Sequence, residues 1–323
     1  MTPTARARST GMSGRPRPAR MLWITAALAG CFIGVQWGLR DAPLVWFAAL
    51  RALVGGAALA VVALLQRRPL PREWRTWGSL ALLGLINVTL AYWAMFAGIA
   101  AQATGVAAVL SNAQPLLILL PAWWLYGERL SPRTTVALLV GFGGLVIVAL
   151  PGGGGSGAVL SLLSAAAVTT GTLLVRHLRG ADVVVASAVY FLIGGAALAV
   201  IAAVTEGTPD IHWTPRFIGV LAFLGLVATA ATSLAWFVET QRCALASLTA
   251  WMFLVPVFGL LLGVVVLAER PAGWTLLGIV LVLLSMGVAL TRSRSAPTRL
   301  PPERTRTAAV PTHTHCEESH GIV

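Results

Sequence analysis

The sequence predicts an all-α integral membrane protein, with ten transmembrane helices arranged as two inverted five-helix repeats. Its 323 residues are 57% hydrophobic and only 11% charged, a composition that excludes a soluble globular protein. Stretches almost free of charge recur along the chain. In two of them a proline stands thirteen residues before a glutamate, Pro115 before Glu128 and Pro256 before Glu269, which indicates an internal duplication.

The ten expected helices are apolar stretches of 17 or more residues. At about 1.5 Å per residue, each can cross a hydrocarbon core of roughly 30 Å, the shortest only just. The first five are Met21–Leu39, Leu44–Leu65, Trp77–Ile99, Thr104–Leu125 and Thr134–Leu150. The second five are Ala158–Val175, Val183–Val204, Phe217–Val238, Leu245–Ala268 and Trp274–Leu290. An odd number of crossings separates the two copies, so we expect them in opposite orientations, as is typical of secondary transporters.

Polar and glycine-rich segments divide the chain into five parts. Residues 1–20 are expected to form a disordered, basic cytoplasmic tail, and residues 292–323 a second disordered tail in which no metal site is expected. The first repeat covers residues 21–150 and the second covers residues 158–291. Between them, residues 151–157 read Pro-Gly-Gly-Gly-Gly-Ser-Gly, which is typical of a flexible linker.

The net charge of +12 would suggest a nucleic-acid partner in a soluble chain, but here the arginines sort by membrane side. Nineteen fall in the tails and in the loops expected on the inner face, three in outer loops (Arg40, Arg216 and Arg270), and Arg51 lies within a span. By the positive-inside rule we expect a multi-pass protein of the cell membrane with both termini cytoplasmic. Membrane lipids are then its surroundings, and no nucleic-acid partner is expected. The sequence leaves both a monomer and a homodimer as alternatives.

Several short motifs stand out, and all but the first of them recur in the same order in both halves. They are the Leu50-Arg51-Ala52 step, the two prolines, the Gly127-Glu128-Arg129-Leu130 turn, its second copy Ala268-Glu269-Arg270-Pro271, and a glycine-rich final helix in each repeat. With these the chain resembles, over about residues 22–291, the drug/metabolite transporter superfamily of the ten-helix type with two EamA repeats. It departs in having Ala29-Gly30 near the usual Trp-Gly pair and Ala268 where glycine is usual. The resemblance implies an exporter of amino acids, small metabolites or toxic compounds.

Two polar stripes indicate a solute site. Because proline lacks an amide hydrogen, Pro115 is expected to free the carbonyl of Ser111 near mid-membrane. Pro256 is expected to do the same for Met252. The stripe on the fourth helix is Thr104, Ala108, Ser111, Asn112 and Pro115, and the stripe on the eighth is Gly225, Thr229, Thr232, Ser233 and Trp236. Polar side chains at membrane depth line cavities, although small hydroxyl residues also serve as ordinary helix-packing contacts.

Further candidates are amide, aromatic and basic. Asn112 and Asn87 carry amides that are costly to bury unpaired. An aromatic wall for a flat or cationic solute is predicted from Trp37, Tyr92, Trp93, Trp236 and Trp251, with core packing as the alternative. Arg51 is predicted either to hold a substrate carboxylate or to serve structure on a peripheral helix.

The acidic residues lie at or beyond the ends of spans. Glu128 and Glu269 are expected to be structural, accepting backbone hydrogens or pairing with neighbouring arginines. Glu239 is the one acid placed for proton coupling, although Arg242 is a ready partner for it. We therefore predict facilitated diffusion or exchange, with proton coupling only through Glu239.

These observations favour a secondary transporter that exports a small molecule by alternating access. The rival classes are an integral-membrane enzyme and a channel-like protein. An enzyme needs a nucleophile with a base, a metal site or an acid pair, and no His, Asp, Glu or Lys lies in the centre of any expected span. No catalytic residue, metal or cofactor is predicted.

Overall fold

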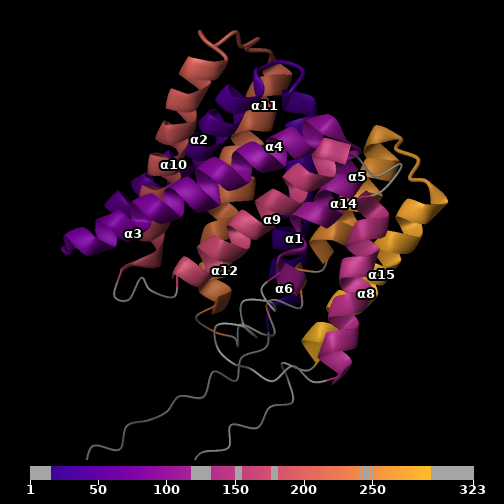
Figure 1. The fold of residues 1–323 in the computed structure, drawn as a ribbon. Coiled ribbons are helices and arrows are strands. Elements are labelled where there is room, and N and C mark those ends of the chain that lie inside the picture. Colours follow the sequence, from indigo (N-terminus) through magenta and orange to yellow (C-terminus); the bar gives the residue numbers. More distant parts are fainter. Residues whose placement is uncertain are drawn as a thin grey trace, which may run out of the picture.

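The computed structural model describes residues 16–117, 132–149, 155–175, 181–240, 242, 248, 251–252 and 254–291. Within these ranges the regular structure is helical throughout, with no strand (Figure 1). Most of both expected tails, residues 151–154 of the linker and the Glu128 turn lie outside the described residues. Residues 18–20, expected in the tail, and residues 155–157, expected in the linker, are helical. This confirms the all-α class for the part of the chain that is described.

The first half of the chain contains eight described helical elements. They are α1 (Pro18–Gly38), α2 (Leu44–Leu65), α3 (Trp74–Gly84), the π-helix η1 (Leu85–Leu90), α4 (Ala91–Ala101), α5 (Thr104–Ser111), α6 (Gln114–Leu117) and α8 (Pro132–Ala149). Because η1 joins α3 to α4 without a break, the third expected helix is one rod with a π segment in it. The fourth is broken between α5 and α6.

The second half follows the same order. Its helices are α9 (Gly155–Val175), α10 (Val183–Thr205), α11 (Pro215–Ala222), the π-helix η2 (Phe223–Ala231), α12 (Thr232–Thr240), α14 (Leu254–Leu267) and α15 (Gly273–Thr291). The rod formed by α11, η2 and α12 again contains a π segment. Both π segments therefore lie in the third helix of their half. π turns are rare and occur mostly at functional sites.

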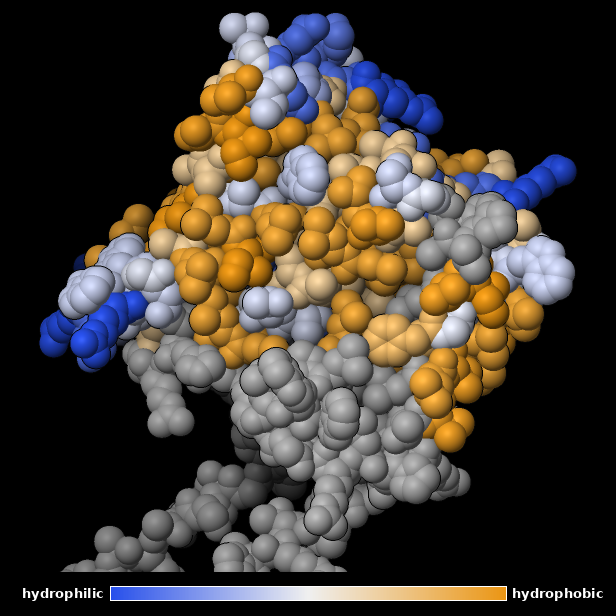
Figure 2. All heavy atoms as spheres, viewed as in Figure 1, coloured by the Kyte–Doolittle hydropathy of each residue, from blue (hydrophilic) through white to orange (hydrophobic). Residues whose placement is uncertain are grey.

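Six of the described helical units are long and apolar enough to cross a membrane. They are α1, α2, the α3–α4 rod, α9, α10 and the α11–α12 rod; α14 and the first part of α15 are shorter apolar helices. Large hydrophobic side chains point outward, as with Leu65 and Val204, which are 79% and 81% exposed. Figure 2 shows apolar side chains across the middle of one face, with hydrophilic ones gathered toward its edges. A lipid solvent explains this exterior. The count of ten spans remains a prediction.

Helices of one half pack mainly on helices of the other. The second helices, α2 and α10, lie along each other, and α5 packs on α14 and α8 on α15 (Figure 1). Two further contacts come in matching pairs: α1 packs on α14 as α9 packs on α5, and α1 contacts η2 as α9 contacts η1. The same set of neighbours therefore surrounds corresponding helices in the two halves.

Glycines allow the closest crossings. A Cβ added at Gly84 would lie 2.6 Å from the carbonyl oxygen of Tyr190, and one added at Gly194 would lie 2.5 Å from the carbonyl oxygen of Gly84. In the matching crossing of the other half, a Cβ at Gly225 would lie 2.5 Å from Val54 and one at Gly55 2.6 Å from Thr229. Small residues let helix backbones approach where lipid gives no hydrophobic driving force. These crossings place η1 against α10 and η2 against α2.

Acidic residues cap helix ends from the opposite half. Glu206, which follows α10, accepts hydrogen bonds from the amides of Val45 and Trp46 at the start of α2, at 2.9 and 3.0 Å. At the other end of the same helix pair, Asp182 caps α10 through the amides of Val184 and Val185.

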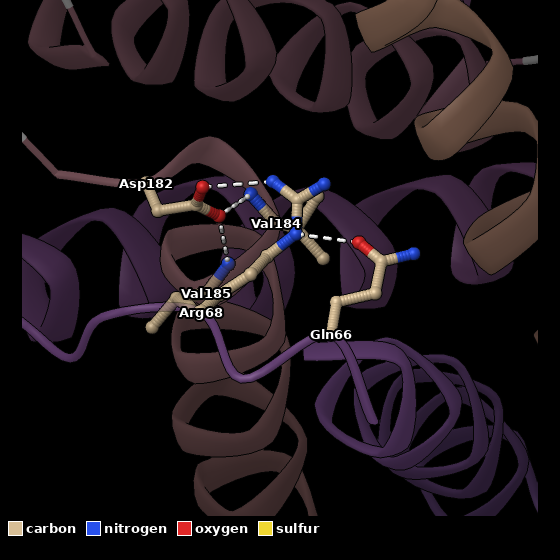
Figure 3. A network of polar contacts seen from close by, with 5 residues as sticks. All are labelled: Gln66, Arg68, Asp182, Val184 and Val185. Atoms are coloured by element: carbon tan, nitrogen blue, oxygen red, sulfur yellow. Dashed lines mark hydrogen bonds and ion pairs between the residues drawn. The ribbon is translucent and has the colours of Figure 1, made fainter. Parts of the chain in front are cut away.

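The Asp182 cap is itself held by the opposite half. Arg68, which follows α2, binds the Asp182 carboxylate at 2.7 Å and also donates to Gln66 (Figure 3). Charged caps at both ends of the pair thus hold α2 and α10 at a fixed position along each other. A second ion pair, Arg216 with Asp41 at 2.8 Å, joins the start of α11 to the connection between α1 and α2.

The departure at Ala268 has a measurable consequence. Ala268 follows α14 with φ 54°, a left-handed conformation in which a side chain costs about 1–2 kcal/mol relative to glycine. Ala268→Gly is therefore expected to raise the thermal midpoint of the detergent-solubilised protein. Ala272→Gly, outside that conformation, is the matched control and should not raise it. An unchanged or lower midpoint for Ala268→Gly would contradict the assignment.

Candidate functional site

The helix break predicted at Pro115 is present. α5 ends at Ser111, and α6 begins at Gln114. The side-chain amide of Asn112 donates to the carbonyl oxygen of Ala108 at 2.7 Å, so one of its four hydrogen-bonding positions is used by its own helix. The hydroxyl of Ser111 is buried without a hydrogen-bond partner in the described part of the chain. Both residues therefore lie at an irregular point of the fourth helix, where a polar solute would find free groups.

The hydroxyls of the second stripe bond backward along their own rod. Thr232 donates toward the carbonyls of Ala228 and Thr229 at 2.9 and 3.2 Å, and Ser233 to that of Thr229 at 2.6 Å. The hydroxyl of Thr229 donates to the carbonyl oxygen of Leu224, five residues back, within the π-helix η2. The hydrogens of Thr232 and Ser233 are thus occupied, while their oxygens can still accept a bond. Their contact with solute remains a prediction.

The tryptophan candidates separate in space. Trp236 and Trp251 pack in one apolar cluster with Met21 and Ile24, near the N-terminal end of α1. Trp37 lies near the other end of α1 and is 36% exposed. The structure therefore brings Trp236 and Trp251 together without Trp37. Trp93 also lies on an exposed face.

Arg51 lies in the core, with 4% of its surface exposed. Its guanidinium carbon is 4.4 Å from the centre of the Tyr92 ring and 5.9 Å from that of Phe96, both on α4. The thiol of Cys31 on α1 lies beside the guanidinium. The expectation of a peripheral helix 2 was wrong, because α2 packs against α10, η2 and α4.

Tyr92 links this cluster to the second half. Its hydroxyl lies within hydrogen-bonding reach of Thr229 on η2. Thr229 in turn packs against Gly55, one helical turn beyond Arg51 on α2. We name Arg51, Tyr92, Cys31 and Thr229 the Arg51 cluster. It is built from α1, α2, α4 and η2, and so from both halves of the chain.

Several buried polar atoms have no hydrogen-bond partner among the described residues. They are Gln36 Oε1, Arg51 Nε and Nη1, Asn87 Oδ1, Gln102 Oε1 and Ser111 Oγ. Each such atom costs free energy unless water or a ligand pairs with it. Three of the five residues, Arg51, Asn87 and Ser111, were predicted from the sequence. Asn87 lies on η1 against Gly171 of α9, where an added Cβ would be 2.7 Å from its amide oxygen.

Glu239 has a partner that its sequence neighbourhood did not suggest. Its carboxylate is 0% exposed and binds Arg20 of α1 at 2.6 Å, with the amide of Arg17 at 3.5 Å from its second oxygen. The sequence had suggested Arg242 as its partner. A contact between α1 and the end of α12 therefore holds this acid, which ties Glu239 to the packing of the two halves.

Glu269 performs the structural role expected of it. Its two carboxylate oxygens accept hydrogen bonds from the amides of Thr104 and Gly105, at 2.6 and 2.9 Å. The carboxylate thereby caps α5 from the end of α14, in the opposite half. Its counterpart Glu128 lies outside the described residues.

Sequence reasoning missed Cys31 and Gln36. A single cysteine or glutamine in an apolar span carries no spacing signal. A helical projection of α1 alone gives no reason to place Cys31 beside Arg51, because the contact depends on how α1 and α2 pack.

Asn112→Leu is expected to impair transport at a near-normal protein level in the membrane. The substitution removes an amide at the break between α5 and α6, while leucine suits a packed or lipid-facing position. Solute flux and membrane protein level measured together test this. A parallel loss of both would instead assign Asn112 to structure.

The similarity of the chain to known proteins agrees with this architecture. The model of the EamA-like transporter family matches it twice, at residues 19–150 and 155–291. The uncharacterized transporter sll0355 of Synechocystis sp. is 27% identical over 286 residues, covering 82% of this chain and 85% of that protein. The uncharacterized transporter YvbV of Bacillus subtilis is 28% identical over 272 residues, covering 81% and 89%.

A similarity in fold accompanies the similarity in sequence. One protein of known crystal structure superposes with a TM-score of 0.61 at 21% identity, covering 87% of this chain and all of that one. At this identity the likeness speaks for the fold alone. The two family matches span nearly all of the apolar helices described above. The chain is thus a multi-pass membrane protein that belongs to the EamA-like transporter family, within the drug/metabolite transporter superfamily.

Proposed function

We propose that the protein is a secondary transporter that exports amino acids or other small metabolites and drugs by alternating access. The observation that carries the proposal is the repetition of one unit: the family model matches twice, and each half has a π segment in its third helix. Two similar halves that pack on each other can rock about a central site, which is the usual basis of alternating access.

The matched contacts between the halves support an inverted repeat of five helices each. The close crossing of η1 on α10 corresponds to that of η2 on α2, and the contact of α1 with α14 corresponds to that of α9 with α5. Such reciprocal contacts are what a pseudo-two-fold axis between two copies produces. We propose ten spans on this basis, with residues 151–157 on the outer side as the connection.

Cysteine labelling tests the orientation. With both termini cytoplasmic, a Ser156→Cys protein should react with a membrane-impermeant maleimide in intact cells. Leu70→Cys, on the connection between α2 and α3, should react only after permeabilisation. Both variants are made with Cys243 and Cys316 replaced by serine. The reverse pattern, or equal access of the two positions, would overturn the inverted arrangement.

Transport is tested in two steps. Culture media of cells that overexpress the protein are compared with media of cells carrying an empty vector, and each enriched metabolite is then loaded into proteoliposomes. Efflux should exceed that from protein-free vesicles, and an imposed pH gradient should not drive accumulation if Glu239 serves packing. Accumulation driven by pH that survives Glu239→Gln would refute the coupling part of the proposal. Absence of any flux, for every enriched metabolite, would refute transport itself.

A further inference from the structure

Arg51 is a cation placed at membrane depth. It lies about 12 Å along α2 from Pro43, at 1.5 Å per residue, and is almost completely buried. A charge in this position is costly and in membrane proteins marks a solute or ion pathway more often than not. Its partners therefore decide what it does.

The neighbours of Arg51 do not satisfy its donors. The faces of Tyr92 and Phe96 attract the cation but accept no strong hydrogen bond from it, and Nε and Nη1 are buried without a partner among the residues that the structure describes. A guanidinium carries five donors in a planar fork that fits a carboxylate bidentately. Nε and Nη1 belong to different edges of this fork, so each edge has one unpaired donor for an anionic oxygen.

The acids that are buried among the described residues pair with other arginines. Asp41 binds Arg216 and Glu239 binds Arg20, both at the ends of helices. No ion pair to Arg51 occurs within the described ranges. Burying the unpaired donors of Arg51 costs free energy. An anionic oxygen from a bound solute would pair with these donors and remove that cost.

We propose that Arg51 binds a carboxylate, or a similar monoanionic group, of the transported solute, with the ring of Tyr92 as the adjoining wall. This inference rests on the proposed transport function and names the class of solute. The ring of Tyr92 lies 6.1 Å from that of Phe191 on α10, so an anion bound between Arg51 and Tyr92 lies where the two halves meet. Binding there acts on both halves, as a solute that drives their relative motion must.

Matched pairs of probes test the charge requirement directly. Benzoate is compared with benzamide and butyrate with butyramide, because each pair differs chiefly in the negative charge. The readout is the thermal midpoint of the purified full-length protein in detergent, across a titration of each probe. Carboxylates should raise the midpoint with an affinity about tenfold or more above that of the amides, as expected for charge-assisted hydrogen bonds.

Alkylation of Cys31 gives a second readout that reports on the place of binding. In a protein with Cys243 and Cys316 replaced by serine, N-ethylmaleimide can modify only Cys31, beside the guanidinium. Carboxylates that raise the midpoint should slow this reaction, and their amides should not. Cys31→Ser in the same background is the blank.

Variants of Arg51 decide between solute binding and structure. Arg51→Gln should abolish the preference for carboxylates over amides, and Arg51→Lys should retain part of it because the charge remains. Arg68→Gln, which removes a cation paired with Asp182, is the matched control and should keep the full preference. If Arg51→Gln does not fold, the wild type and Arg51→Lys still compare carboxylate with amide.

Equal shifts by carboxylate and amide in the wild type, or a preference that survives Arg51→Gln, would overturn the proposal. These failures differ from failure of the transport function. A protein that exports solutes without regard to their charge remains a transporter in which Arg51 serves structure. A protein that binds carboxylates but shows no flux in proteoliposomes retains the anion site and loses the transport function.

Discussion

Gly84→Ala is expected to destabilise the protein, and Gly194→Ala likewise. The added methyl of the first would lie 2.6 Å from the carbonyl oxygen of Tyr190 and that of the second 2.5 Å from the carbonyl oxygen of Gly84. Neither oxygen can move without shifting a helix backbone, and overpacking of this kind costs about 1–3 kcal/mol or more. The gain in helix propensity from glycine to alanine is only about 0.5–1 kcal/mol, so the collision decides the sign.

Gly78→Ala is the matched control for Gly84→Ala. Gly78 lies on the same helix, α3, and a Cβ there meets nothing within 4 Å. Without a collision, the propensity term should leave the protein as stable as the wild type or slightly more so. Size-exclusion profiles and thermal midpoints in detergent compare the three variants. Wild-type behaviour of Gly84→Ala would contradict the close crossing of η1 and α10.

Glu269→Ala is also expected to lower the stability of the protein. It removes both acceptors from the amides of Thr104 and Gly105 and leaves the start of α5 without its cap. Hydrogen bonds to a charged acceptor contribute about 1.5–3 kcal/mol each, less where water can replace them. We therefore expect a lower thermal midpoint and reduced transport, because α5 leads directly to the break at Asn112.

Two other substitutions sharpen this experiment. Glu269→Gln keeps an acceptor oxygen but not the charge, so it should lose part of the stability that Glu269→Ala loses. Glu73 precedes α3, is exposed, and makes no side-chain cap, so Glu73→Ala should leave the midpoint unchanged. Equal midpoints for Glu269→Ala and the wild type would show that water replaces the cap.

The contacts that cap and pair helix ends have a common pattern that bears on mechanism. Glu206 reaches α2, Glu269 reaches α5 and Glu239 reaches Arg20, each from a helix of the opposite half. Rocking of one half against the other must break or rebuild some of these contacts. They are thus candidate determinants of the rate of opening, while the Arg51 cluster is the candidate determinant of what is carried.

The sequence by itself determined that this protein lies in a membrane, and it determined the positions of most of its helices. Hydropathy over 17 or more residues is a local property, and the limits expected for the helix at 44–65 match those of α2. The break expected before Pro115 is equally local, because it follows from a missing amide hydrogen. The structural role of Glu269 was also foreseeable, since a carboxylate at a helix end has few other uses in an apolar chain.

Only the tertiary structure decided which groups those residues meet. Glu269 caps an amide 165 positions away, and Glu239 pairs with Arg20 at a separation of 219. The burial of Arg51 beside Cys31 and Tyr92 likewise depends on the approach of α1 and α4 to α2. Side-chain periodicity gives the apolar face of one helix but not its neighbour. In lipid, which helices pack together depends on how closely small residues such as Gly84 and Gly194 let their backbones approach. Hydropathy carries no information about this fit.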